Sequence, residues 1–135
     1  MRVVIELLGH PQGRGRARFT RAGFAYTPQK TRTYDENLGA AAGRAMNGQT
    51  PMTGPLEVWF EAVFPVPSSW SKKKRSQALS GIIRPCVKPD GDNILKQLDS
   101  LNGIVFGDDK QVVDAHVKKV YGERPALYVI VETIQ

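Results

Sequence analysis

Alternation of apolar and polar side chains predicts strands in several parts of the chain. In residues 55–66, PLEVWFEAVFPV, every second position from Leu56 to Phe64 is apolar, as in a strand with one buried face. The segment RVVIELL is rich in the apolar and β-branched residues that favour strands. The pattern predicts four strands in total, over Arg2–Leu8, Pro55–Val66, Gln111–Tyr121 and Ala126–Ile134.

Three helices are predicted between these strands, over Thr33–Met46, Ser68–Ser80 and Asp92–Leu101. Ser69 or Ser71 is suited to cap the second helix, and Gly81 follows its end. Asn102-Gly103 is a typical signal for the end of the third helix. Ala22-Gly23 predicts a short hairpin or an exposed loop before the first helix.

The order of these elements favours an α+β fold, because strands and helices do not alternate strictly. We expect a two-layer sandwich of a mixed β-sheet with helices on one face, and not a doubly wound parallel sheet. The last two strands are predicted to pair as a hairpin across Gly122–Pro125. A length of 135 residues predicts a single domain over residues 1–135.

Several classes of protein are disfavoured by composition. No apolar run approaches the roughly 18 residues that a membrane-spanning helix needs. The single cysteine, Cys86, excludes a disulfide within one chain and a CxxC zinc site. The two histidines, His10 and His116, are far apart in sequence, which argues against zinc. We therefore expect a cytoplasmic protein that does not bind a membrane.

A formal net charge of +6 favours a polyanionic partner, with nucleic acid first and an acidic membrane surface second. The basic side chains concentrate in residues 9–32, which contain no acid, and in the run KKKR. Phe19, Phe24 and Tyr26 interleave with the first group, where they could stack on exposed bases or pack in the core. The candidate DNA-binding residues are Arg14, Arg16, Arg18, Arg21, Lys30, Arg32, Lys72, Lys73, Lys74 and Arg75.

An acidic window interrupts this basic chain. Residues 90–114 contain six of the thirteen acidic residues and only two lysines, Lys96 and Lys110. This window therefore has a net charge of −4, and the rest of the chain has a net charge of +10, which together give the formal +6. Such a window is needed where metal ions must be held against a phosphate backbone. A solvated acidic loop beside a charged helix would give the same charge count.

Within this window, Asp92, Lys96 and Asp99 share one side of the predicted helix. The opposite side carries the apolar residues Ile94, Leu95, Leu98 and Leu101. Asp92 could simply favour the helix start by roughly 0.3–1 kcal/mol and pair with Lys96 for about 0.2–0.5 kcal/mol. Asp90 is harder to explain in this way, because it lies two positions from a second carboxylate.

A divalent cation would relieve this repulsion. Mg²⁺ prefers hard oxygen ligands and is typically held by one or two carboxylates plus a substrate phosphate. A calcium loop of the EF-hand type is excluded, because Ile94 and Leu95 occupy positions that require a ligand and a glycine. If the chain turns back after Gly107, Asp108 and Asp109 approach Asp90 and Asp92. The sequence thus predicts a magnesium site beside Lys96.

The stretch KPDGDNILKQLDSLNGIVFGDDKQV, residues 88–112, resembles the signature of the RusA-type Holliday junction resolvases. It contains the DxDN run, a lysine four residues after the second aspartate, the D-x-L-N-G helix end and the DD-x-Q-V stretch of that family. GRARFTRAGFAYTP and SWSKKKRSQALSG are also similar to segments of the family. Similarity therefore covers most of the chain.

This resemblance implies a homodimeric, Mg²⁺-dependent endodeoxyribonuclease that nicks four-way DNA junctions symmetrically, in recombination and repair. It implies that Asp90, Asp92 and Asp109 bind the metal and that Lys96 is the catalytic lysine, with Asp108 ranked lower and Asp99 left without a role. Two alternatives remain open from the residues. One is a non-catalytic basic module that binds nucleic acid, and the other is a nuclease for flap or other branched DNA.

Overall fold

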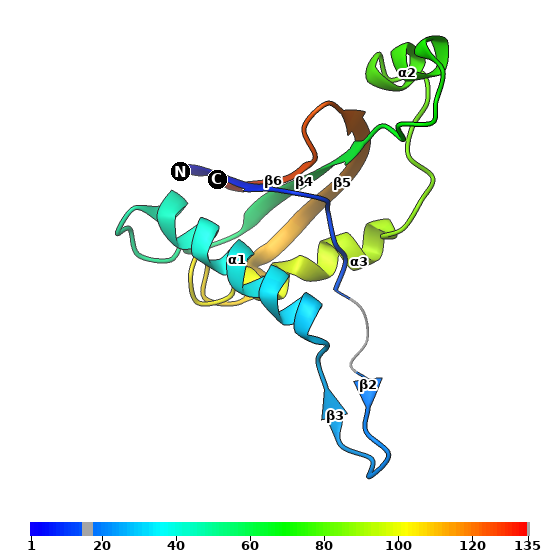
Figure 1. Ribbon diagram of the computed structural model, residues 1–135. Coiled ribbons are helices and arrows are strands. Elements are labelled where there is room, and N and C mark those ends of the chain that lie inside the picture. The colour runs from blue at the N-terminus through cyan, green and yellow to red at the C-terminus, as the bar shows by residue number, and fades with distance from the viewer. Residues whose placement is uncertain (15–17, 135) are drawn as a thin grey trace.

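The computed structural model describes residues 1–14 and 18–134, and its centre is a four-stranded sheet (Figure 1). The strands are β1 (Arg2–Leu8), β4 (Leu56–Pro65), β5 (Val112–Gly122) and β6 (Ala126–Thr133). They follow the spatial order β1-β6-β4-β5. β6 pairs antiparallel with β1 and β4, whereas β4 and β5 are parallel, so the sheet is mixed.

Helices cover one face of this sheet. The helix α1 (Gln29–Met46) and the short helix α3 (Gly91–Leu95), which continues as the 3-10 helix η1 (Lys96–Leu101), lie on the same side of the strands (Figure 1). The predicted α+β sandwich with helices on one face is therefore confirmed. The helix α2 (Lys72–Leu79) differs from the others, because it lies beyond the end of β4 and β5 (Figure 1).

The core lies between the sheet and this helical layer. β4 buries every second side chain, as its alternation predicted: Leu56, Val58, Phe60, Ala62 and Phe64. Leu38 of α1 and Ile94 of α3 are fully buried in the same cluster. Each large apolar side chain removed from water contributes roughly 1.5–3 kcal/mol. The apolar face of the helix that carries the aspartates is therefore fixed against the sheet.

The predicted hairpin between the last two strands is wrong. β5 and β6 are joined by the short turn after Gly122, but β4 lies between them in the sheet. Strands lie about 4.8 Å apart and an extended residue spans about 3.3–3.6 Å, so three residues suffice to cross one intervening strand. A Cβ atom at Gly122 would approach the Val63 Cγ1 within 2.5 Å, which shows how closely the chain passes β4.

The predicted helices are confirmed with changes at their ends. α1 begins at Gln29, four residues earlier than predicted. In α2, the Ser71 Oγ accepts a hydrogen bond from the Lys74 N–H at 3.2 Å, so Ser71 is the cap. The third helix tightens to 3-10 geometry from Lys96. No helix among residues 1–14 and 18–134 has the length and apolarity needed to cross a membrane.

Of the short hairpin or exposed loop predicted at Ala22-Gly23, the structure shows the hairpin. It consists of β2 (Arg18–Phe19) and β3 (Ala25–Tyr26), and Gly23 adopts φ +86° in the turn. The hairpin extends away from the sheet and helices (Figure 1). Phe19 and Phe24 are 70% and 72% exposed, so they are not core residues.

Candidate active site

The two aspartates of the DGDN run stand at the start of α3. Asp90 occupies the N-cap position and Asp92 the first turn, and both are exposed. The Asp90 side chain makes no capping hydrogen bond. The Lys96 Nζ donates to the Asn93 Oδ1 at 3.1 Å, and the ion pairs found in the described part of the chain do not include one between Lys96 and Asp92. Helix capping and local pairing therefore do not account for these carboxylates.

The chain that follows β1 packs against the start of α3. The Arg14 N–H donates to the Asn93 carbonyl at 3.0 Å. A Cβ atom at Gly13 would lie 2.7 Å from the Asn93 Cβ and 2.8 Å from the Pro89 Cβ, so this approach requires glycine. Together these segments line a cleft of about 430 Å³. Lys30, Lys88 and His10 lie around Asp90 there, so the cleft combines a carboxylate with groups that attract phosphate.

The side chain of Gln111 holds the turn over residues 107–109, which we call the GDD turn. The Gln111 Oε1 accepts from the N–H groups of Gly107 and Asp108 at 3.0 and 3.1 Å, and its Nε2 donates to the carbonyls of Met52 and Gly54. The Asp108 Oδ1 accepts from the Lys110 N–H at 2.8 Å, which caps the 3-10 helix η2 (Asp109–Gln111). The Asp108 side chain therefore caps the turn, and the half-buried Asp109 is the other carboxylate of the turn.

Asp109 lies beside the end of η1. Partial burial raises the pKa of the Asp109 carboxyl, and the negative charges of Asp108 and Asp99 raise it further. Asp99 also forms an ion pair with Arg14 at 3.2 Å, and Arg14 in turn approaches Asp35 of α1 at 3.5 Å. The family resemblance left Asp99 without a role, whereas the structure places it beside Asp109.

The side chains of the three predicted metal ligands, Asp90, Asp92 and Asp109, do not form one tight cluster in the described residues. Within residues 1–14 and 18–134, three ligand atoms lie within 4.8 Å of one another at Glu57, Asp114 and His116, and the Asp90–Asp92–Asp109 set does not reach this spacing. The acids of residues 90–109 lie in two groups along α3 and η1, whereas Asp114 lies on β5 beside Glu57 and His116. Asp90 and Asp92 begin this segment, and Asp109 joins Asp99 at its far end.

The structure also reveals a buried polar residue that sequence reasoning missed. Gln97 is fully buried, its Nε2 donates to the Gln12 carbonyl at 3.2 Å, and its Oε1 accepts from the Ser100 hydroxyl. Because Gln97 lies three residues after Ile94, helical periodicity places it on the inner side of the helix. Its burial could therefore have been predicted from the sequence. Gln97 and Arg14 together fasten the segment before the β2–β3 hairpin to the helix that carries the aspartates.

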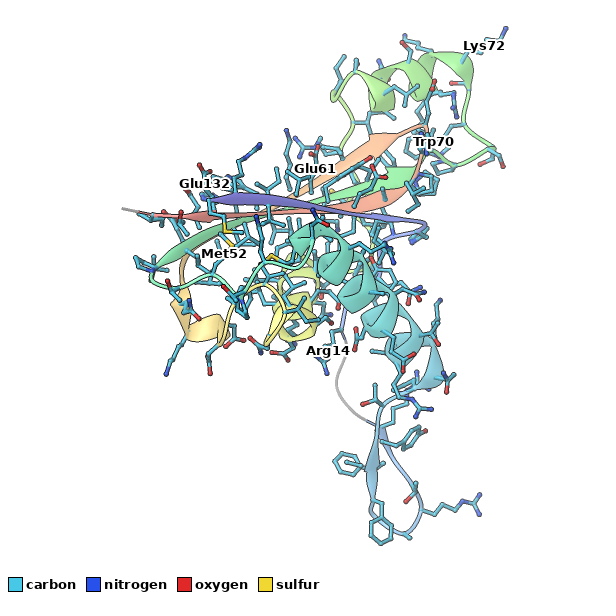
Figure 2. All side chains as sticks on the ribbon, turned by 90° about the vertical axis from the view of Figure 1, so that its left-hand side faces the viewer. Arg14, Met52, Glu61, Trp70, Lys72 and Glu132 are labelled. Atoms are coloured by element: carbon cyan, nitrogen blue, oxygen red, sulfur yellow. The ribbon has the colours of Figure 1, made fainter. Side chains whose placement is uncertain are left out.

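The candidate DNA-binding residues that the structure describes lie in four places. Arg18 and Arg21 lie in the exposed β2–β3 hairpin, and Lys30 and Arg32 are exposed in the first turn of α1. The four basic residues Lys72–Arg75 are exposed on α2, where Figure 2 shows Lys72 pointing outward. Arg14 is half-buried between two carboxylates, and Arg16 falls outside the described residues. The start of α3 lies between the hairpin and α2 (Figure 1).

Exposed aspartates beside a lysine-lined cleft, flanked by basic segments, are typical of proteins that act on a phosphate backbone. The family described as endodeoxyribonuclease RusA matches residues 9–132. An uncharacterized protein of Bacillus subtilis strain 168, YqaN, is 35% identical over 138 aligned residues, which cover 98% of this chain and 96% of the relative. The chain belongs to the RusA endodeoxyribonuclease family, as its sequence signature indicated.

Proposed function

We propose that this protein is a Mg²⁺-dependent endonuclease that resolves four-way DNA junctions by paired symmetrical nicks in recombination and repair. The observation that carries the proposal is the pair of exposed, uncapped aspartates at the start of α3, in a chain of the RusA family. Asp90, Asp92 and Asp109 offer only carboxylate oxygens, which is the donor chemistry that Mg²⁺ prefers. These residues therefore fit the metal that the family resemblance implies.

Bound Mg²⁺ would activate a water and stabilise the charge that develops on the scissile phosphate. Asp90 and Asp92 would hold it at the start of α3, and Asp109 is the third ligand that we propose. Lys96 lies one turn along the same exposed side, where its ammonium can stabilise negative charge on the phosphate or on the leaving oxygen. Lys30 and Lys88 would bind the adjoining phosphates and orient the strand.

The basic segments on either side of the site would supply affinity for DNA. Lysine and arginine contacts to phosphate give sequence-independent binding that falls steeply with salt. The hairpin adds exposed Phe19, Phe24 and Tyr26, and an aromatic surface of this kind is suited to stack on bases unpaired at a branch point. A homodimer would match the near two-fold symmetry of the junction and place one site on each of two strands.

A substrate comparison tests this proposal. The purified full-length chain is given a four-way junction, a flap and a plain duplex of matched sequence, each with Mg²⁺ and with chelator. We expect paired nicks in the junction with Mg²⁺, much slower cutting of the other two substrates, and no cutting with chelator. The oligomeric state is measured in the same preparation by light scattering, and we expect a dimer.

The same assay separates the alternatives. Binding of the junction without metal-dependent cutting of any DNA would overturn the proposal in favour of a non-catalytic binding module. Faster cutting of the flap than of the junction would retain the nuclease and overturn the assignment of its substrate. Cutting that continues in chelator would contradict the role given to the aspartates.

A further inference from the structure

A second group of metal-type ligands lies on the face of the sheet that no helix covers. Glu57 belongs to β4, and Asp114 and His116 belong to the neighbouring edge strand β5. This open face also carries Glu61 and Glu132, which Figure 2 shows on the side of the sheet opposite α1. The group is therefore separated by the sheet from α3 and its aspartates.

A β-bulge assembles this group. Leu56 pairs with Val112 but Glu57 pairs with Asp114, so Val113 is the extra residue of β5. Because side chains alternate between the two faces of a strand, one inserted residue moves every later side chain to the other face. Without the bulge Asp114 and His116 would point toward the helical layer. Bulges of this kind often re-aim side chains at functional sites.

The three side chains converge on one imidazole nitrogen. The His116 Nε2 lies 2.9 Å from the Glu57 Oε2 and 3.7 Å from the Asp114 Oδ1. One ligand atom from each residue lies within 4.8 Å of the other two. All three side chains remain reachable from solvent, with exposures of 27% for Glu57, 58% for Asp114 and 46% for His116.

Two further contacts favour a cation at this point. The His116 ring stacks on the Trp59 indole with their centroids 5.4 Å apart and their planes inclined by 11°, which fixes the direction of the ring nitrogens. Glu57 and Asp114 are directly paired across β4 and β5, and like charges in such a pair destabilise a sheet. A divalent ion between them would reverse this repulsion more completely than a single imidazole can.

We propose that Glu57, Asp114 and His116 form a second metal site, for a transition-metal ion of the zinc type. Imidazole nitrogen together with carboxylate oxygen suits Zn²⁺, whereas Mg²⁺ favours oxygen ligands alone. Three protein ligands leave a coordination position open to water. The ion would join the first residues of β5 to the central strand β4, and so stabilise an edge strand at its irregular end.

Isothermal titration with zinc chloride tests the proposal on the chelator-treated, full-length chain without DNA. We expect one equivalent of Zn²⁺ to bind in the presence of millimolar Mg²⁺. Replacing a ligand, by His116→Gln, should weaken this binding by about tenfold or more. His10→Gln and Asp92→Asn are the matched controls, one for the other histidine and one for the helix-side aspartates, and both should retain wild-type zinc affinity.

Cobalt provides a second readout that does not depend on heat. A visible absorption band should appear with one equivalent of Co²⁺ and should be absent in His116→Gln. The proposal is overturned if zinc fails to saturate a site, if His116→Gln binds as tightly as the wild type, or if Asp92→Asn loses the binding. Because no DNA is cut in these titrations, their outcome is independent of the nuclease assay.

Discussion

The two acidic groups of this protein lie on opposite faces of one sheet and are built in different ways. Asp90 and Asp92 come from one short segment at the start of α3, beside a cleft that Lys30 and Lys88 line. Glu57 and Asp114 come from two paired strands and converge with an imidazole. The first group offers only oxygen ligands and lies next to the two lysines of the cleft. The second group combines oxygen with nitrogen ligands and lies on the other face of the sheet.

This difference teaches that ligand chemistry and electrostatic surroundings must be considered together. Carboxylates can take part in phosphate chemistry only where nearby cations offset their repulsion of the DNA, as at the start of α3. On the open face, four carboxylates, those of Glu57, Glu61, Asp114 and Glu132, outnumber the cations of Arg2 and Lys118, so the net charge of this group is unfavourable for a phosphate backbone. We therefore assign DNA cleavage to the helix side and the nitrogen-containing site to the open face. The following variants are designed to break or sharpen this distinction.

Apart from loss of the aspartates themselves, the largest effect is expected for Lys96, on the helix side. Lys96→Met removes the ammonium that would stabilise charge on the phosphate, and cleavage should fall roughly 100- to 1,000-fold. The measurement is the single-turnover rate on a four-way junction with Mg²⁺. Lys118→Met, on the open face, is the matched control and should cut at the wild-type rate. Equal losses in both variants would contradict the assignment of the two faces.

The next effect concerns the exposed hairpin. Phe24→Ala should weaken binding to the junction by the value of one base stack, about 1–3 kcal/mol, or roughly 5- to 150-fold. Thermal stability should not change, because Phe24 is 72% exposed. Fluorescence anisotropy with a labelled junction measures the affinity. Leu8→Ala removes an exposed apolar side chain of β1 and should leave binding intact, so a loss there would argue against specific stacking.

Gln111→Ala should affect stability and cleavage together. The side chain links the GDD turn to the carbonyls of Met52 and Gly54. Its loss should lower the free energy of unfolding by about 1–3 kcal/mol and slow cleavage, because Asp109 loses its fixed position. Urea denaturation and the junction assay measure the two effects. Gln49→Ala, an exposed glutamine, should change neither. Full cleavage by a destabilised Gln111→Ala would remove Asp109 from the site.

The smallest expected effect is a dependence of folding stability on pH, caused by Asp35. Burial raises the pKa of Asp35 in the folded chain, although the Arg14 guanidinium opposes the shift. The folded protein then binds the proton more tightly than the unfolded chain, so Asp35 costs stability once pH rises through its folded pKa. Relative to Asp35→Asn, the wild type should therefore lose stability as pH rises above about 4. Urea midpoints across pH that shift in parallel would contradict this.

The fold was predictable where each element is determined locally. The alternation of β4 and the serine cap of α2 needed no knowledge of other segments. The pairing of β5 was not predictable in this way, because a short turn permits either a hairpin or a crossing over β4. Only the position of β4 between its neighbours decides the outcome, and this depends on packing of the whole core.

The candidate site shows the same division. The DGDN run could be predicted because its carboxylates are neighbours in sequence, and their exposure at the start of α3 follows from the apolar side of the helix. The ion pairs of Arg14 with Asp35 and Asp99 could not, since they join three distant segments. His116 was set aside for want of a nearby second histidine. Its carboxylate neighbours could not be predicted from the sequence, because they depend on the bulge that aligns Glu57 with Asp114.

The central claim is that the aspartates at the start of α3 carry metal-dependent cleavage. Its most direct test compares Asp92→Asn with the wild type and with Glu123→Gln, an exposed acid in the turn between β5 and β6. Junction binding and junction cutting are measured side by side in Mg²⁺. The account predicts that Asp92→Asn binds the junction at least as tightly as the wild type and cuts it roughly 1,000-fold more slowly, while Glu123→Gln does both normally. Cutting by Asp92→Asn at the wild-type rate would contradict the account.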